Sequence, residues 1–150
     1  MDKSQTCFAG KKFSKSIPVF DVLGDLDELN AALGIARAFA SQNLNQQILQ
    51  IQNDLIEVGG FLAGLKKVDF KAKSLFLEKE IKKITKPSVK TFSRPGQNEI
   101  SAFLHSARAL CRRLERRVIS LKEPKMKSLI SFLNSLSNFI FWLARKEEKI

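Results

Sequence analysis

A helical repeat of apolar residues runs through almost the whole chain. One stretch shows it with great regularity, because its apolar residues are separated by four and three positions in turn. This seam comprises Leu44, Ile48, Ile51, Leu55, Val58 and Leu62. Such spacing places all these side chains on one face of an α-helix, and that face must pack against other helices.

The same periodicity predicts five helices. They run roughly over residues 20–39, 44–64, 70–84, 100–121 and 126–143. Pro87, Pro95 with Gly96, and Pro124 separate the later helices, since proline does not continue a helix. No strand-like alternation competes with this pattern, and the short connections predict antiparallel neighbours. We therefore expect an all-α, five-helix up-and-down bundle that forms a single domain over residues 1–150, with residues 1–19 as an extended N-terminal arm.

The composition indicates the kind of partner. Of the 150 residues, 44% are hydrophobic and 27% are charged, which is ordinary for a globular protein. Lysine and arginine number 26 against 15 aspartates and glutamates, a formal net charge of +11. A chain this basic is expected to meet something anionic, whether nucleic acid, an acidic membrane or a phosphate-rich ligand.

The cysteines, the single histidine and the apolar runs indicate the cellular environment of the protein and the kinds of site that it lacks. Cys7 and Cys111 stand in no paired motif, and His105 is the single histidine, so we expect neither a disulfide framework nor a zinc site. The polar start resembles no signal segment, and the richest apolar run, residues 139–144, is too short to span a membrane. We expect a cytoplasmic location, no protein-held metal and no membrane partner.

The fourth expected helix carries a dense run of charge. On a helical wheel at about 100° per residue, Arg108, Arg112 and Glu115 fall at one edge of the apolar stripe. Arg113 and Arg117 fall on the side facing away, where solvent alone would satisfy them. The first group is either a solvated basic edge with pairs four residues apart, or a phosphate clamp built from arginine forks.

The first expected helix has polar residues inside its apolar arc. Asn30 and Arg37 lie among the leucines of that arc, and buried polar groups need partners. They indicate either a hydrogen-bond network in the core or a ligand site. Asp25, Asp27 and Glu28 form an acidic run that we expect near the helix start, where negative charge complements the helix dipole.

Two further side chains leave their roles open. Phe92 precedes the turn at Pro95, so it is either a hydrophobic staple for the next helix or an aromatic group that projects into a cleft. Asn134 can reach the apolar seam of the last helix, where hydrogen bonding between helices is its simplest role.

Four blocks of sequence occur in a recognisable order. They are Ser14 and Lys15 followed by GDLDELNAALG at 24–34, GGFLA at 59–63, FSRPG at 92–96 followed by LHSARALCRRLERR at 104–117, and FLNSLSN at 132–138. In this order and spacing they resemble the PduO-type corrinoid adenosyltransferases, also called cob(I)alamin adenosyltransferases. The resemblance covers residues 10–145. It implies an enzyme that transfers the 5′-deoxyadenosyl group of ATP to the cobalt of reduced cobalamin and releases triphosphate, in a homotrimer with its active site between subunits.

The resemblance also implies roles for particular residues. ATP is expected to contact Lys15, Arg112, Glu115 and Asn134, while Asp27 and Arg108 are expected to pair across the subunit interface. Phe92 is expected under the corrin ring, where it displaces the lower axial ligand and leaves a four-coordinate cobalt that is easier to reduce. Phe92 and Arg112 are thus the residues expected at the reacting centre.

The chemistry implied by the resemblance also indicates partners. Cobalt(I) is itself the nucleophile, so no side-chain nucleophile is required, and Mg²⁺ is expected to share the phosphate charge. A reductase or a cobalamin-dependent enzyme is a further expected partner.

The chain departs from the family pattern at several positions. Its N-terminal phosphate loop is reduced to Asp2 and Lys3, with Ser4 where a glycine is expected. Other departures are Gln97 for a glycine, Ser135 for an arginine and Asn138 for an aspartate. These keep open a divergent paralogue that binds ATP or a corrinoid without turnover. A basic helical nucleic-acid binder is disfavoured, because the lysines spread over several helices instead of forming one stripe.

Overall fold

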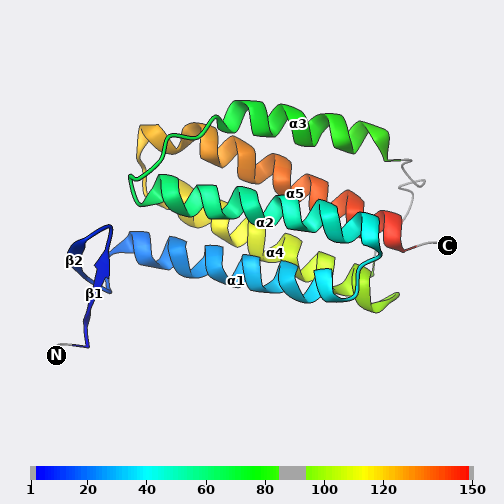
Figure 1. Cartoon of the computed structure of the whole chain (residues 1–150), viewed down its shortest axis with the longest axis horizontal. Coiled ribbons are helices and arrows are strands. Elements are labelled where there is room, and N and C mark those ends of the chain that lie inside the picture. Colours follow the sequence, from blue (N-terminus) through cyan, green and yellow to red (C-terminus); the bar gives the residue numbers. More distant parts are fainter. Residues whose placement is uncertain (1–2, 85–93, 149–150) are drawn as a thin grey trace.

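Five long helices form one bundle in the computed structural model, which describes residues 3–84 and 94–148 (Figure 1). The elements are β1 (Gln5–Phe8), β2 (Lys11–Ser14), α1 (Pro18–Ala38), α2 (Gln42–Leu62), α3 (Phe70–Lys83), α4 (Glu99–Ser120), the 3₁₀ turn η1 (Pro124–Met126) and α5 (Lys127–Glu147). Successive helices run in opposite directions along the long axis of the molecule. The expected five-helix up-and-down bundle is therefore confirmed.

Local side chains fix where the helices begin. Pro18 occupies the first turn of α1, where the missing N–H has no intrahelical partner to lose. Asp69 caps α3 by accepting a hydrogen bond from the Ala72 N–H at 3.0 Å, and Asn98 caps α4 by accepting one from the Ser101 N–H at 2.8 Å. Because such signals act independently of the apolar period, α1 begins slightly before the residue that the period indicates.

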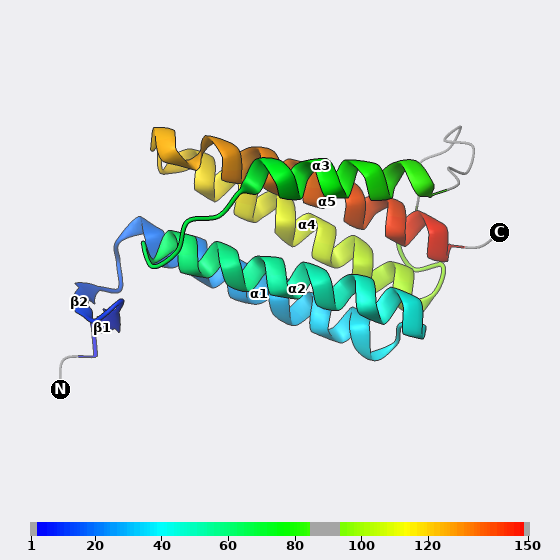
Figure 2. The ribbon, with the colours of Figure 1, turned by 45° about the horizontal axis from the view of Figure 1, so that its top comes forward.

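The helices do not pack simply in sequence order. Helix α4 lies between α1 and α5, and α3 lies along α5 instead of along α2 (Figures 1 and 2). Since the chain passes through α4 between them, α3 and α5 run parallel, whereas the sequence pattern predicted antiparallel neighbours. Phe70 of α3 and Phe132 of α5 are both fully buried, with ring centres 5.6 Å apart, and this contact fixes α3 on the bundle.

Apolar side chains from all five helices meet in a single core. The largest fully buried ones are Phe70, Phe132, Leu29, Leu33, Ile48, Ile51, Leu55, Leu77, Leu104, Leu114, Leu129 and Leu133. Within the residues that the structure describes, no helix is both long and apolar enough to cross a membrane.

The N-terminal segment contains a small β-hairpin, although no strand-like alternation marks it in the sequence. Strands β1 and β2 pair antiparallel, and the two residues between them, Ala9 and Gly10, have φ of 50° and 78°. A two-residue hairpin turn needs such positive values. The Phe8 ring packs edge-on against Phe13 and Phe20, at 6.5 and 5.6 Å between ring centres. Strands of four residues are too short to show an alternating pattern in the sequence.

A buried carboxylate joins α1 to α4. Asp25 is 5% exposed, and its oxygens lie 2.9 Å from Arg113 Nε and 2.7 Å from Arg117 Nε. Glu28 also pairs with Arg113, and Asp21 lies 3.4 Å from Arg117. Arg113 and Arg117 therefore do not face solvent alone as predicted, because α1 lies along that side of α4. Asp25 and Glu28 of the acidic run lie well inside α1, so their role is this pairing and not compensation of the helix dipole.

The Asp25 pairing makes a prediction about stability. Asp25→Ala should lower the free energy of unfolding by about 2 kcal/mol, because two guanidinium groups lose a buried partner. The control Asp21→Ala removes a carboxylate that is 67% exposed and should cost less than about 0.5 kcal/mol. Urea unfolding followed by circular dichroism measures both. Equal midpoints would show that Asp25 does not hold α1 to α4.

Candidate functional site

A polar pocket of about 340 Å³ opens between α4 and α5. Its lining consists of Arg108 and Arg112 from α4 with Asn134, Ser137, Asn138 and Phe141 from α5. On each helix these residues recur every three or four positions, so they share one face. The structure thus brings together three predicted site residues, Arg108, Arg112 and Asn134. Since the described lining contains two arginines and no carboxylate, the pocket is suited to an anion such as a phosphate.

Arg108 is held by packing but has an unsatisfied atom. Its guanidinium carbon lies 5.9 Å from the centre of the Phe141 ring, a cation–π contact. Its Nε is buried and has no hydrogen-bond partner among the described residues. Because an unpaired buried donor costs free energy, this atom points to an acceptor supplied by a ligand or by another chain. Phe141 was not predicted, although it lies seven residues after Asn134 on the same helical face.

Of the four predicted ATP contacts, Arg112 and Asn134 line this pocket. Arg112 and Asn134 are exposed there. The Ser137 hydroxyl donates to the backbone oxygen of Asn134 at 2.9 Å, so it satisfies the backbone and not the Asn134 side chain. Glu115 is half-buried and lies one turn beyond Arg112 on the same edge of α4, outside the pocket lining.

A second pocket, of about 230 Å³, lies between α1 and α2. It is lined by Leu23, Leu26, Asp27, Asn30, Leu55, Ile56 and Gly59. Asp27 is exposed here, and the side-chain oxygen of Asn30 is buried without a hydrogen-bond partner among the described residues. Asp27 and Arg108 therefore lie in different grooves, and a single chain does not bring this predicted pair together.

The two polar residues in the apolar arc of α1 have different surroundings. Arg37 donates to Asn45 Oδ1 at 3.0 Å and to Gln52 Oε1 at 3.3 Å. The Gln52 amide in turn donates to the backbone oxygen of Asn30 at 3.2 Å. Of the two alternatives left open for this arc, the hydrogen-bond network is present at Arg37, whereas the side chain of Asn30 lines the second pocket.

Lys15 is a predicted site residue that lies outside both pockets. Lys15 follows the hairpin, is exposed, and donates its backbone N–H to the carbonyl of Ser4 at 2.9 Å. The hairpin projects beyond the start of α1 (Figure 2). Phe92 lies outside the described residues, so both of its possible roles stay open. In the turn that leads into α4, Gly96 has φ of 106°, a value that favours glycine.

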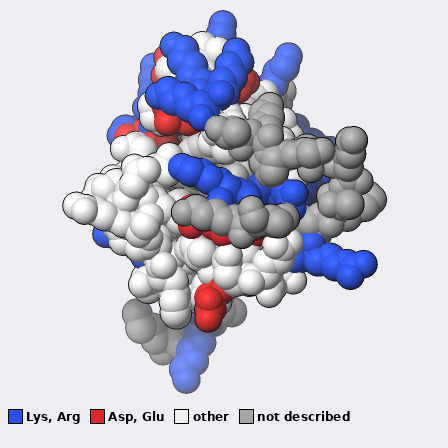
Figure 3. Space-filling view, turned by 90° about the vertical axis from the view of Figure 1, so that its right-hand side faces the viewer, with Lys and Arg blue, Asp and Glu red and all other residues white. Residues whose placement is uncertain are grey.

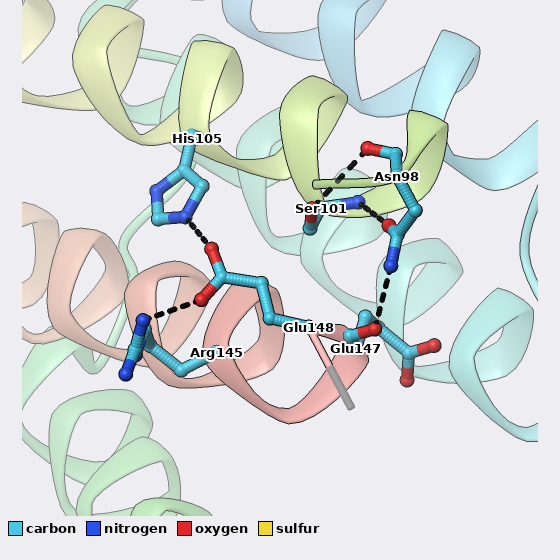
Figure 4. A network of polar contacts seen from close by, with 6 residues as sticks. All are labelled: Asn98, Ser101, His105, Arg145, Glu147 and Glu148. Carbon is cyan, nitrogen blue, oxygen red and sulfur yellow. Dashed lines mark hydrogen bonds and ion pairs between the residues drawn. The ribbon is translucent and has the colours of Figure 1, made fainter. Parts of the chain in front are cut away.

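Buried polar groups tie the start of α4 to the end of α5 (Figure 4). The Glu148 carboxylate lies 2.6 Å from His105 Nε2 and 2.5 Å from Arg145 Nη1, and all three side chains are buried. The Asn98 amide donates to the backbone oxygen of Glu147 at 2.8 Å. This network was not predicted. Its one signal in the sequence is the spacing of three residues between Arg145 and Glu148.

Comparison with known proteins identifies the family. The family model described as cobalamin adenosyltransferase matches residues 1–147. The chain belongs to the cobalamin adenosyltransferase family. It is 35% identical to a corrinoid adenosyltransferase of Bacillus subtilis strain 168, over 96% of this chain and 81% of that protein. It is 36% identical to the human corrinoid adenosyltransferase MMAB over 92% of this chain, which spans 62% of the human protein.

Solved structures of the same family share this fold. A phenylalanine-to-alanine variant of the PduO-type ATP:corrinoid adenosyltransferase from Lactobacillus reuteri, complexed with cobalamin and ATP, has a TM-score of 0.89. It is 29% identical, over 98% of this chain and 90% of that chain. An arginine-to-lysine variant complexed with ATP has a TM-score of 0.88 at 30% identity, with the same coverage. The resemblance to the PduO-type family is therefore confirmed.

The network at the end of the bundle predicts that substitutions of the neighbouring Glu147 and Glu148 differ in their effect on stability. Glu148→Ala should lower the free energy of unfolding by about 3 kcal/mol, because the Arg145 guanidinium stays buried without this partner. Glu147→Ala keeps the backbone oxygen that accepts from Asn98 and should cost less than about 0.5 kcal/mol. Thermal and urea unfolding of both variants provide the comparison. A similar loss in both would mean that the network does not stabilise this end.

Proposed function

We propose that this corrinoid adenosyltransferase works at a site shared by two copies of the chain. The reaction transfers the 5′-deoxyadenosyl group of ATP to the cobalt of reduced cobalamin and releases triphosphate. The separation of two incomplete half-sites supports the shared site. The pocket between α4 and α5 holds the unpaired Nε of Arg108, and the pocket between α1 and α2 holds Asp27 and the unpaired oxygen of Asn30. The pocket between α4 and α5 thus offers an unpaired donor, and the pocket between α1 and α2 offers acceptor oxygens.

The assembly we infer is a homotrimer. Because the half-sites lie in different grooves of one chain, contact between copies joins unlike surfaces, and repeated contacts of this kind form a ring when the rotation between copies closes. An Asp27 carboxylate at the Arg108 guanidinium of the next copy would satisfy that buried donor. Three copies are the number that the family resemblance implies.

The reaction requires little covalent chemistry from the side chains of the protein. The electron pair of cobalt(I) forms the bond to C5′ of ATP, while the bond from C5′ to oxygen breaks and triphosphate leaves with its electrons. The side chains contribute position and positive charge. Arg112 would donate to the leaving phosphates, Asn134 and Glu115 would orient the nucleotide, and Lys15 would contact the phosphates from the hairpin. Phe92 would lie under the corrin and keep the lower axial position empty.

Further components are inferred from the same chemistry. Mg²⁺ binds nucleotides largely through phosphate oxygens and water, so we propose it as a companion of ATP. Among the described residues, no group of three or more His, Cys, Asp or Glu side chains is arranged to hold a metal ion. A reductase that supplies cobalt(I) and a cobalamin-dependent enzyme that takes the product are the partners we propose, in the cytoplasm.

One observation favours the alternative of a paralogue that binds without turnover. The backbone N–H of Lys15 is donated to the Ser4 carbonyl, so this donor is already used within the chain and is not free for a phosphate. Titration with ATP and cobalamin under strong reductant, followed optically for adenosylcobalamin, decides between the two. Product formation supports the enzyme, and binding of both ligands without product supports the paralogue.

The phosphate role of Arg112 predicts a selective kinetic defect. Arg112→Ala should raise the KM for ATP about ten- to a hundredfold with little change in corrinoid binding, because a charge-assisted donor to phosphate is lost. The control Arg116→Ala removes an equal charge from an exposed position on the same helix, outside the pocket lining, and should leave the KM unchanged. Initial rates at saturating cobalamin measure both. Identical behaviour would make Arg112 an ordinary surface charge.

The shared site predicts that exchanged charges restore assembly. Asp27→Arg should prevent trimer formation, because it sets two positive groups against each other, and Arg108→Asp should do the same with two negative groups. The double variant restores an opposite-charge pair and should sediment as a trimer again. Sedimentation equilibrium at micromolar concentration tests the series. Single variants that assemble like the unaltered chain would show that these two grooves do not meet.

A further inference from the structure

The outward face of α3 combines lysines with exposed apolar side chains. On a wheel at about 100° per residue, one arc of α3 contains seven residues, all exposed. These residues, called here the α3 outer face, are Lys71, Ala72, Leu75, Phe76, Lys79, Lys82 and Lys83. Leu75 is 49% and Phe76 50% exposed. Both carboxylates of the helix, Glu78 and Glu80, fall outside this arc.

The charge of this face is largely uncompensated. Among the described residues, Lys83 is the one lysine of the α3 outer face with an ion-pair partner, Glu80. Figure 3 shows lysine and arginine side chains gathered over the end of α3, at the top of the view. Basic and apolar groups therefore alternate along a surface that is not covered by the rest of the bundle.

A groove runs beside Phe76, between α3 and α2. It measures about 200 Å³, enough for one large apolar side chain. Its floor is apolar, formed by Ile51, Leu77 and Phe139, with Phe76 on its rim. The wall on α2 is formed by the glutamines at 46, 47 and 50, whose amides can bond to a peptide.

Two carboxylates line the groove, Asp54 and Glu80, and both are already paired, Glu80 with Lys83. Asp54 lines the groove and lies 2.6 Å from Lys73 Nζ, and Lys73 also lies 3.1 Å from Glu57. Burial alone would lower the pKa of Lys73, but its hydrogen bonds to Asp54 and Glu57 raise it, so Lys73 stays charged. The same hydrogen bonding from Lys66 and Lys73 lowers the pKa of Glu57. These carboxylates therefore do not oppose a negatively charged partner.

We propose that the α3 outer face and the adjacent groove form a docking surface for an acidic amphipathic helix of a partner protein. The helix would insert one large apolar side chain into the groove beside Phe76. Its glutamates or aspartates would lie against Lys71, Lys79 and Lys82. Apolar anchors in pockets supply most of the affinity of such contacts, and complementary charge supplies rate and specificity.

The surface itself favours this occupant over two others. A bilayer would contact the lysines, but it would not fill a concave groove that is walled by glutamine amides. A side chain that protrudes from a partner helix would fill it. A second copy of this chain would bring the same lysine-rich face, or it would bring α1. Three carboxylates of α1 are paired with arginines, and the fourth, Asp27, belongs to the proposed shared site, so α1 offers no free acidic face. The docking surface also shares no residue with the two half-sites of the proposed adenosyl transfer.

Two designed helical peptides provide the first test. Both carry leucine and phenylalanine along one face, and they differ by having glutamate or lysine on the flanks. Fluorescence anisotropy should show binding of the acidic peptide to the whole protein, weaker binding at higher salt, and no binding of the basic peptide. Hydrogen exchange on the unaltered protein should then show new protection in α2 and α3 and none in α4.

Matched variants locate the contact. Phe76→Ser, and separately Lys79→Glu with Lys82→Glu, should each weaken the acidic peptide about tenfold or more. The apolar control is Ile119→Ser, because Ile119 is 49% exposed on α4. The charge control is Lys122→Glu with Lys127→Glu, two exposed positions with the same change in net charge. Both controls should bind like the unaltered protein.

Several outcomes would overturn the proposal. These are equal binding of the two peptides, no binding of either, an equal loss in the controls, or protection that appears in α4. Binding to vesicles of phosphatidylserine and phosphatidylcholine that displaces the peptide would assign the face to a membrane instead. None of these measurements uses adenosyl transfer, so failure here is separate from failure of the proposed function.

Discussion

The buried carboxylate of Asp25 decides which positive charges of α4 remain available. The helix presents arginines along two edges, and Asp25 lies between the pair on the α1 side. Without that carboxylate, the arginines on the two edges of α4 would repel one another, and both pairs would be available to the same anions. With it, Arg113 and Arg117 become part of the helix contact, and Arg108 and Arg112 are left to line the pocket against α5. The ion pairs of Asp25 thus leave the positive charge that is available for binding in a single groove, the one between α4 and α5.

The bundle explains why a single chain carries two half-sites. A helix that packs between two neighbours buries its apolar arc and leaves a polar edge in each adjoining groove. Helix α1 puts Asp27 toward the groove with α2, and α4 puts Arg108 toward the groove with α5. Core packing keeps these grooves apart, so the unpaired Nε of Arg108 is best satisfied from outside the chain.

The sequence predicted the helices well, because each helix repeats one physical signal over several turns. It was harder to predict which helices pack against one another. A wheel drawn for α4 places Arg113 and Arg117 away from the apolar arc, but it cannot show that α1 lies there. The parallel contact of α3 with α5 depends on Phe70 and Phe132, which are distant in sequence. For the site, the wheel placed Arg108 beside Arg112, and the family resemblance added Asn134. The contribution of Phe141 appears only when α4 and α5 are side by side.

Helix α5 is common to the candidate site and to the docking surface proposed on α3. Phe139 forms part of the groove floor beside α3, and Phe141 lines the pocket beside α4. Coupling between two sites requires an element with two arrangements that both sites bias. Most turns of α5 are buried between α3 and α4, and its end is held by Arg145 and Glu148, so it acts as a rigid spacer. A helix docked on α3 is therefore expected to leave the pocket on the opposite side of α5 unchanged, which allows a partner to be bound while the nucleotide is in place.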